Sequence, residues 1–375
     1  MLNLLDYLKT CPNKKLDSKS FTEVDGLLFA EFSYLRFENF ISKKNLPLKF
    51  KQIANDLALK FLNIDKMYRY EFINLALKYS TITPRYMDTE IVNFKASFSE
   101  KYIKQFFGIT FIINDLLIIS FRGTDTTFVG WREDIDFGIK DDVLCQKDAK
   151  KYVDAMAKAY PDKKIVVVGH SKGGNLALYG SIFAEPEVRD RILTTYNYDG
   201  PGMSLKNYNS TEYITYVPKI KSYTTSESLF GLLMYHQEDI ICVKSSNKGI
   251  LKHEAFSWQI EKNHFVKDKL SDKTVFIATA LNNWMNAMTK KQKQEFFDTI
   301  FAIGSNNGQI KNFQADLNAS RIFNGFKQIQ SLSKPERKAV LDGFSLLYDL
   351  YEATVTSANQ KIPILLKFVA KRFLK

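Results

Sequence analysis

The residues best suited to chemistry surround Ser171, in the run Val168-Gly169-His170-Ser171-Lys172-Gly173. This G-x-S-x-G sequence directly follows a β-branched segment and directly precedes an apolar helical one. In that setting a serine occupies a sharp strand-to-helix turn, and its hydroxyl is exposed at the edge of the sheet. Gly169 and Gly173 fit this interpretation, because a Cβ at either position would collide with the neighbouring strand or helix. Ser171 is therefore the candidate nucleophile, whereas a chance match would lack the flanking strand and helix.

A serine that attacks a carbonyl group needs N–H donors for the oxyanion that forms. The N–H of Lys172 would lie at a helix N-terminus, where unpaired donors and the helix dipole favour negative charge. Thr124 is the second predicted donor, because it follows an apolar strand that ends at Arg122-Gly123. An ordinary glycine-containing turn is the alternative there. Four nearby residues could form a charged wall around the site, although a structural role is the favoured interpretation: Trp131, Arg132, Glu133 and Asp134.

A serine hydroxyl becomes a good nucleophile when a base removes its proton. In folds whose catalytic residues occur along the chain in the order serine, acid, histidine, the base is a histidine late in the chain. The sequence has four histidines. His170 lies within the turn itself, where its side chain should point away from that of Ser171. His253 follows the last predicted strand, where a base-bearing loop belongs, and is preferred to His236 and His264. A solvent-facing imidazole is the alternative interpretation of each.

The acid that would orient the base is less sharply indicated. Asp199 ends a predicted strand and begins a Gly-Pro-Gly turn, which would hold its carboxylate at the carboxyl edge of the sheet. Glu227 follows the next strand, which is the other customary position, and Asp239 is a third alternative. Acidic residues on strand-end turns are usually solvated caps. Asp199 is preferred because it alone has a rigid frame in which to fix the imidazole.

The elements that must position these side chains alternate between strands and helices from about residue 90 to 260, the pattern of a mostly parallel sheet. Residues 108–113 and 116–121 flank Asn114-Asp115 and predict a hairpin with a tight turn. Residues 164–168 form a β-branched run typical of a strand covered on both faces. Further expected elements are helices at about 147–159 and 173–184, and strands at 194–198, 220–225 and 240–243.

Helical periodicity precedes and follows this core. Phe50, Ile53, Leu57 and Phe61 recur at spacings of three and four, as do Tyr68, Phe72, Leu75 and Tyr79. Helices are also expected at 275–287, 290–303 and 336–351. The predicted organisation is a helical N-terminal region at 1–85, an α/β core at 86–272 and a helical C-terminal region at 273–375.

Composition excludes several classes of protein. Apolar residues make up 45% and charged residues 25% of the 375 positions, as in ordinary globular chains. Three dispersed cysteines indicate neither a zinc site nor a disulfide scaffold. A phosphate-binding turn is disfavoured because neither G-x-x-x-x-G-K-[ST] nor G-x-G-x-x-G is present. No cofactor or metal is therefore expected.

The net charge of +12 favours anionic neighbours. Nucleic acid is not expected, since no helix-turn-helix, zinc or aromatic RNA-binding signature accompanies the charge. The N-terminus does not read as a secretory signal, and no apolar run approaches the roughly 18 residues of a spanning helix. We expect a cytoplasmic protein, with peripheral association with membranes as the alternative location. Residues 364–375 place Lys367, Lys371 and Lys375 opposite an apolar face, which suits contact with an anionic membrane, although packing on its own domain is the favoured alternative.

Two families share these motifs. Phe121-Arg122-Gly123-Thr124 with Gly169-His170-Ser171-Lys172-Gly173-Gly174 resembles the class 3, or fungal-type, lipases. The fuller pattern resembles a bacterial family of α/β hydrolases of unknown function, the Mbeg-like family, over about residues 20 to 260. It includes Val24-Asp25 near Ser33-Tyr34, Gly130 to Asp134, Tyr198 to Gly202, and His253 ahead of Ser257-Trp258.

The resemblance implies an α/β-hydrolase fold with Ser171 as nucleophile, His253 as base, and Thr124 with Lys172 as oxyanion donors. The fungal-type lipases carry Leu where Lys172 stands, and their acid would fall near Ser226 to Ser228, so the choice of acid stays open. The expected function is hydrolysis of small-molecule or lipid esters. A non-catalytic hydrolase-like module that binds a lipid or a protein is the alternative.

Overall fold

A computed structural model describes residues 2–53, 68–125, 127–305, 332–343, 345 and 346 of the chain. Its centre is an eight-stranded sheet whose strands lie in the order in which they occur in the sequence. The strands are β1 (Leu48–Lys49), β2 (Glu90–Ser99), β3 (Lys104–Ile113), β4 (Leu116–Phe121), β5 (Lys164–His170), β6 (Ile192–Tyr198), β7 (Ile220–Thr225) and β8 (Ile240–Val243). The predicted α/β-hydrolase fold with a mostly parallel central sheet is confirmed.

The sheet changes from antiparallel to parallel at β4. Strands β1 to β4 pair antiparallel, whereas β4 to β8 pair parallel. The predicted hairpin is confirmed as β3 and β4, and Asn114 takes the left-handed φ of 50° that its tight turn requires. Because parallel strands end at one edge, the segments that follow β4, β5, β6 and β7 converge there.

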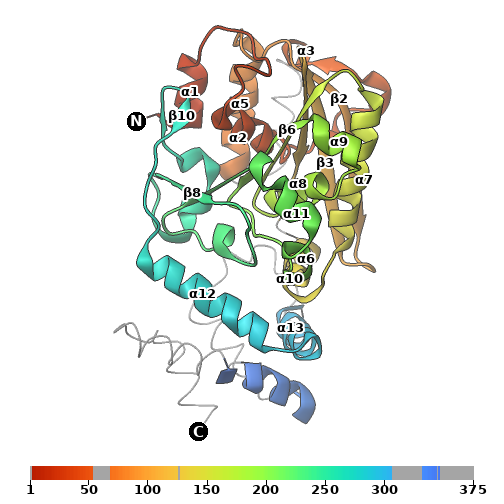
Figure 1. Ribbon diagram of the computed structural model, residues 1–375, viewed down its shortest axis with the longest axis vertical. Coiled ribbons are helices and arrows are strands. Elements are labelled where there is room, and N and C mark those ends of the chain that lie inside the picture. The colour runs from red at the N-terminus through yellow and green to blue at the C-terminus, as the bar shows by residue number, and fades with distance from the viewer. Residues whose placement is uncertain (1, 54–67, 126, 306–331, 344, 347–375) are drawn as a thin grey trace.

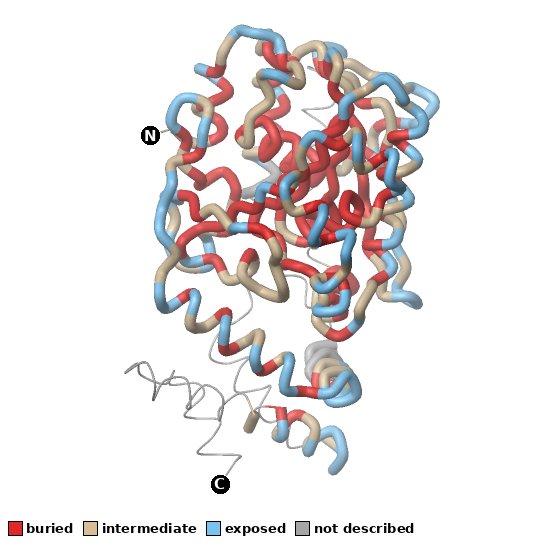
Figure 2. The backbone as a smooth tube through the Cα atoms, in the orientation of Figure 1, coloured by how far each residue is buried: buried red, intermediate tan, exposed pale blue. Residues whose placement is uncertain are grey.

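The two faces of the sheet follow from the alternation of side chains along each strand. Val166 and Val168 of β5 join one core cluster, which also holds residues of α1 (Leu4–Thr10), α2 (Glu23–Phe32) and α5 (Tyr68–Ile82). Ile165 and Val167 join a second cluster with α7 (Leu144–Ala159) and α8 (Lys172–Ile182). Helices therefore cover both faces (Figure 1), and the sheet lies in the buried centre of the molecule (Figure 2).

The remaining elements surround this core. The other helices are α3 (Phe50–Ile53), α6 (Phe128–Ile139), α9 (Pro186–Arg191), α10 (Leu205–Tyr208), α11 (Thr211–Tyr216), α12 (Asp272–Ala287) and α13 (Lys290–Ser305). Short 3-10 turns include η4 (Phe230–Leu232) and η5 (Gly249–His253), and β9 (Ile260–Glu261) pairs with β10 (His264–Phe265). Figure 1 shows α12 and α13 crossing one end of the core. The side chain of Asn282 in α12 ties that helix to the core by accepting from the Met234 N–H at 2.9 Å and donating to the Leu232 carbonyl at 3.0 Å.

Several expectations fall partly or wholly outside the described residues: Leu57 and Phe61, the later part of the helix at 336–351, and the membrane-binding helix at 364–375. Helical structure is present at 334–343, which overlaps the first part of the helix expected at 336–351. Among the described helices, none combines the length and the apolar character that crossing a bilayer requires. The region boundaries after residues 85 and 272 stay predictions, although β1 lies in the same sheet as the later strands.

The turn between β5 and α8 allows a direct test of how closely these elements pack. A Cβ on Gly169 would stand 2.0 Å from the Gly173 carbonyl oxygen, a backbone atom that cannot move aside without shifting α8. We expect Gly169→Ala to lower the free energy of unfolding by about 3 kcal/mol or more, as overpacking of rigid cores does. Urea unfolding of both proteins measures this difference.

Gly249→Ala is the matched control. Gly249 has a left-handed φ of 57° but open space around it, so its substitution should cost only about 1 kcal/mol through backbone strain. Equal stability of Gly169→Ala and the wild type would show that the two elements are not in close contact.

Candidate active site

Ser171 occupies the predicted turn between β5 and α8 in a strained conformation. Its φ of 59° and ψ of −133° are rarely adopted by residues other than glycine. The Ser171 N–H donates to the Tyr198 carbonyl at 2.9 Å, and its own carbonyl accepts from the Gly174 N–H at 2.8 Å. These bonds tie the turn to β6 on one side and to α8 on the other. The half-buried Ser171 lines a cavity of the described part of the chain.

His253 and Asp199 form a buried pair beside that cavity. His253 Nδ1 lies 2.6 Å from Asp199 Oδ2, and Asp199 Oδ1 accepts from the Thr224 hydroxyl at 2.5 Å and from the Gly231 N–H at 3.1 Å. Asp199 is fully buried and has a φ of 54°. The carboxylate is therefore held by three donors, and the imidazole bonds to it through Nδ1 and not through Nε2. No hydrogen bond of the described residues joins Ser171 Oγ to this ring.

The Asp199 turn has the rigid frame that the Gly-Pro-Gly sequence predicts. The Asn197 side chain brackets it, accepting from the Gly200 N–H at 2.9 Å and donating to the Gly200 carbonyl at 3.1 Å. The Asp199 N–H donates to the Tyr223 carbonyl on β7 at 2.7 Å. The acid is thus fixed by backbone contacts with its neighbouring strand and by its own loop.

The His253 ring is held from both sides. Its centroid lies 4.5 Å from that of His170 and 4.4 Å from that of Phe230. His170 Nε2 also lies 2.9 Å from the His253 carbonyl oxygen. Because a carbonyl only accepts, that nitrogen of His170 carries the proton. His170 therefore links the serine turn to the loop that carries His253.

The segment that follows α2 also contacts His170, through the side chain of Tyr34. The Tyr34 hydroxyl lies 3.1 Å from His170 Nδ1 and donates to the His170 carbonyl at 3.2 Å. Arg122 fixes the segment that carries Tyr34: its guanidinium donates to the Ser33 and Leu35 carbonyls at 2.5 and 2.6 Å, and to Glu38 at 2.6 Å. Arg122 thus anchors the segment that carries Tyr34. Arg122 also lies two residues before Thr124 in the chain.

Thr124 lies at the cavity, and its hydroxyl donates to Asp134 Oδ2 at 2.6 Å. Asp134 Oδ1 is buried and has no hydrogen-bond partner among the described residues, although Asp134 as a whole is half-buried. Desolvation of this carboxyl raises its pKa to about 7, against the opposing effects of Lys172 and of the Thr124 hydroxyl. Asp134 therefore holds the hydroxyl of Thr124 at the cavity.

The side chain of Lys172 turns away from the serine into a buried polar cluster. Its ammonium lies 3.0 Å from Glu133 Oε2 and donates to the Gln105 side chain at 2.7 Å and to its carbonyl at 3.1 Å. Burial disfavours the charged form, but Glu133 and Asp134 outweigh it and raise the pKa of Lys172. The cluster of Lys172, Glu133 and Gln105 therefore joins α8, α6 and β3. Glu133 thus supports the site from within, whereas Asp134 lines the cavity and holds the Thr124 hydroxyl.

The alternative site residues lie in other surroundings. Glu227 is paired with Lys252 at 2.8 Å, and Asp239 is exposed. His236 lies 3.1 Å from Glu238, and His264 lies 3.0 Å from Glu23. The structure brings Ser171, His253, Asp199, Thr124 and Lys172 together. Sequence reasoning missed the supporting roles of Thr224, Phe230 and Tyr34, of which only Tyr34 stood in a recognised motif.

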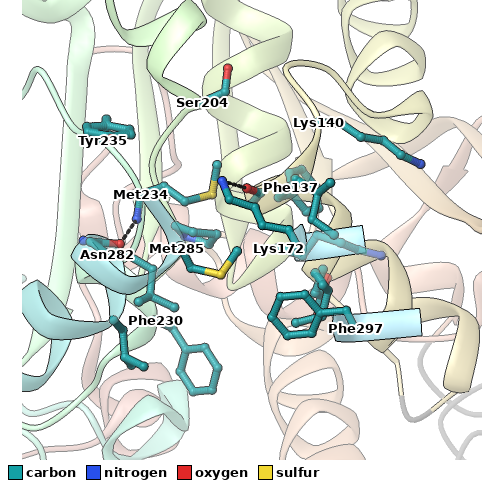
Figure 3. Close-up of a pocket in the computed structure, with 18 of the residues that line it drawn as sticks. Phe137, Lys140, Lys172, Ser204, Phe230, Met234, Tyr235, Asn282, Met285 and Phe297 are labelled. Atoms are coloured by element: carbon teal, nitrogen blue, oxygen red, sulfur yellow. Dashed lines mark hydrogen bonds between the residues drawn. The ribbon is translucent and has the colours of Figure 1, made fainter. Parts of the chain in front are cut away.

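The cavity beside these residues has a volume of about 1020 Å³. Ser171, Thr124 and His253 line it, together with residues of α6, α12 and α13. Figure 3 shows Phe137, Phe230, Met234, Met285 and Phe297 around it. Within the described ranges, no group of three or more His, Cys, Asp or Glu side chains is arranged to hold a metal ion.

The raised pKa of Asp134 predicts a specific pH dependence of stability. An acid whose pKa is higher in the folded than in the unfolded chain binds more protons when folded, so stability falls as pH rises from about 4 to about 7. Relative to Asp134→Asn, the wild type should lose roughly 4 kcal/mol of unfolding free energy across this range, at 1.36 kcal/mol per pKa unit. Urea unfolding at several pH values measures the difference.

Asp162→Asn, which alters an exposed acid, is the control and should follow the wild type at every pH. Parallel curves for the wild type and Asp134→Asn would contradict a raised pKa at Asp134.

The buried Lys172–Glu133 pair should show strong energetic coupling. Lys172→Met and Glu133→Gln should each lower the free energy of unfolding by about 3–5 kcal/mol, because each leaves a buried partner uncompensated. The double variant should lose much less than the sum of the two. Urea unfolding of the four proteins gives the coupling energy.

The exposed Lys150–Glu185 pair, 2.6 Å apart, is the control and should couple by at most about 1 kcal/mol. Additive losses for Lys172 and Glu133 would contradict the interaction.

Comparison with known proteins gives a family and a set of distant structural relatives. A lipase from Rhizopus microsporus var. chinensis is 17% identical, with 54% of this chain and 72% of that chain covered and a TM-score of 0.36. The Rhizomucor miehei lipase propeptide complex is 14% identical, with 68% and 89% covered and a TM-score of 0.35. A sequence comparison with curated proteins found no match. The model of the Mbeg1-like family matches residues 80–302, more than half of the sequence, and the chain belongs to that family.

Proposed function

We propose that the protein is a serine hydrolase that cleaves carboxylic esters through an acyl-enzyme on Ser171. The observation that carries this proposal is the 2.6 Å contact between His253 Nδ1 and Asp199 Oδ2, at a cavity that both His253 and Ser171 line. A buried carboxylate bonded to Nδ1 fixes the imidazole tautomer in which Nε2 can accept a proton. That nitrogen is the base that Ser171 requires.

The reaction proceeds in two halves. Ser171 Oγ attacks the ester carbonyl carbon while His253 Nε2 takes the hydroxyl proton. The tetrahedral intermediate collapses, and the alcohol departs with the proton from Nε2, which leaves an acyl-enzyme. Water then attacks the acyl carbonyl while Nε2 takes one of its protons, and the acid departs as Ser171 regains its hydroxyl hydrogen. Asp199 stabilises the imidazolium in both halves.

The oxyanion is stabilised by the backbone N–H groups of Thr124 and Lys172. The N–H of Lys172 lies at the N-terminus of α8, where the helix dipole favours negative charge. Asp134 accepts from the Thr124 hydroxyl and so fixes the residue that carries the other donor. Donors fixed in advance need no reorganisation when charge develops on the carbonyl oxygen.

The lining of the cavity supports an acyl substrate. Most of its lining surface is apolar and comes from aromatic, methionine and aliphatic side chains, and Ser171, His253 and Thr124 are among the polar residues that line it. Apolar surface with a few convergent polar groups is typical of small-molecule sites. We therefore assign the cavity to the acyl portion of a lipid ester.

Asp199→Asn should lower kcat for a p-nitrophenyl ester by about 10⁴-fold, because the amide no longer selects the imidazole tautomer that can take the serine proton. Ser171→Ala should lower it by about 10⁶-fold. Glu227→Gln and Asp239→Asn are the matched controls and should stay within about twofold of the wild type, because neither acid touches His253. Steady-state assays over a series of acyl chain lengths provide the measurement, with thermal unfolding to verify that each variant is folded.

Folded wild type that turns over no ester, or Ser171→Ala that turns over esters as fast as the wild type, would overturn the proposal. The first result, with retained ligand binding, would favour the non-catalytic binding module. Loss of activity in Glu227→Gln with activity retained in Asp199→Asn would reassign the acid.

A further inference from the structure

The cavity beside Ser171 has lysines along its lining as well as apolar surface. Lys140 follows α6, Lys206 lies in α10, and Lys290 and Lys293 lie in the first turn of α13. These elements adjoin one another, because the Asn207 side chain donates to the Asp141 carbonyl at 3.0 Å and the Lys293 ammonium donates to the Gly138 carbonyl at 3.2 Å. The lysines therefore converge on the part of the cavity next to the end of α6.

Two of these cations are already neutralised and two are not. Lys140 pairs with Asp136 at 2.6 Å, and Lys290 pairs with Asp141 at 2.9 Å. Lys206 and Lys293 have no carboxylate within 4.0 Å in the part of the chain that the structure describes. Of the acids that line the cavity, Asp125 pairs with Arg36, Asp141 pairs with Lys290, and Asp134 accepts from the Thr124 hydroxyl, while Glu254 directly follows His253. Among the described residues of the lining, Lys206 and Lys293 are thus the lysines that pair with no carboxylate.

Lys293 is the more informative of the two, because it is half-buried. An ammonium group has three N–H donors, and the Gly138 carbonyl is the acceptor found for this one. Burial, together with the nearby Lys290, lowers the pKa of Lys293. A partly desolvated cation without a counter-charge is unfavourable, and an anion bound in the cavity would remove that cost.

The rest of the cavity requires an apolar partner. Phe137, Met285 and Phe297 lie together in Figure 3, at the junction of α6, α12 and α13. A volume of about 1020 Å³ lies at the upper end of the range of about 300–1,000 Å³ for sites that enclose one small molecule. The lining therefore fits one elongated apolar chain whose anionic group reaches Lys206 and Lys293.

We propose that the natural substrate is an anionic single-chain lipid ester, whose acyl chain occupies the apolar cavity and whose phosphate or similar anion is bound by Lys206 and Lys293. This inference rests on the proposed ester hydrolysis at Ser171 and specifies its substrate class. The two lysines select the substrate and take no part in bond cleavage.

Ligand binding tests the inference without any turnover. Dodecyl phosphate, which contains no carboxylic ester, is titrated into the full-length wild-type protein below its micellar concentration, with neutral dodecyl glucoside as the uncharged counterpart. Trp131 and Trp284 both line the cavity and report occupancy by fluorescence. Dodecyl phosphate should bind at least about tenfold more tightly than the glucoside, as expected for charge-assisted hydrogen bonds.

The double variant Lys206→Gln/Lys293→Gln should lose that preference and keep its affinity for dodecyl glucoside. Lys78→Gln/Lys158→Gln, which alters two exposed helical lysines outside the cavity lining, is the matched control and should behave as the wild type. Equal affinity of the wild type for both ligands, or an unchanged preference in the cavity variant, would overturn the inference. Inorganic phosphate that binds as tightly as dodecyl phosphate would also overturn it, because the site would then take a free anion.

A kinetic comparison separates this inference from the proposed function. Hydrolysis of monoacylglycerol phosphate should exceed that of monoacylglycerol in kcat/KM by about tenfold, and the cavity variant should abolish the difference. Equal cleavage of both esters would refute the anionic substrate and leave the hydrolase intact. Selective binding of dodecyl phosphate without cleavage of either ester would refute the hydrolase and leave the anion site intact.

Discussion

The backbone of Ser171 is the constraint on which the rest of the site depends. A non-glycine residue with a φ of 59° is unfavourable unless its surroundings enforce it, and here β6 and α8 both do so through backbone hydrogen bonds. Close approach of β5 to α8 requires glycine at 169, where a side chain would meet the Gly173 carbonyl. The same close approach brings the first turn of α8 beside the serine, so the strain that exposes the hydroxyl also places the Lys172 N–H next to it.

The elements around the Ser171 turn pack on the sheet, and buried polar contacts also join them to one another. Arg122 holds the segment after α2, Tyr34 connects that segment to His170, and His170 connects the serine turn to the carbonyl of His253. Lys172 and Glu133 make a similar connection between α8 and α6. Buried polar groups of this kind are costly when unpaired, so each contact penalises any displacement of its partners. The geometry of the site is therefore maintained by groups that need not touch the substrate.

The sequence predicted the parts of the molecule in which local pattern and tertiary environment agree. The β-branched run of β5 and the hairpin at Asn114 are examples, and the rigid Gly-Pro-Gly turn at Asp199 is a third. Strand β2 was not predicted, because it lies toward one edge of the sheet and carries polar residues along its length. Helix α6 was not predicted, because charged residues interrupt its apolar pattern between Arg132 and Asp136. The burial of Glu133 with Lys172 could not be read from a linear pattern, since charged side chains are usually solvated. The convergence of Lys206 and Lys293 depends equally on how distant helices pack.

The most direct measurement of the central claim is the reaction of the full-length protein with a fluorophosphonate, which modifies serine hydroxyls that a neighbouring base has activated. Intact-mass analysis and peptide mapping should give a single adduct per chain, on the peptide that contains Ser171, and no adduct in His253→Ala or in urea. An unmodified protein, an adduct on another serine, or equal modification of His253→Ala would contradict the account.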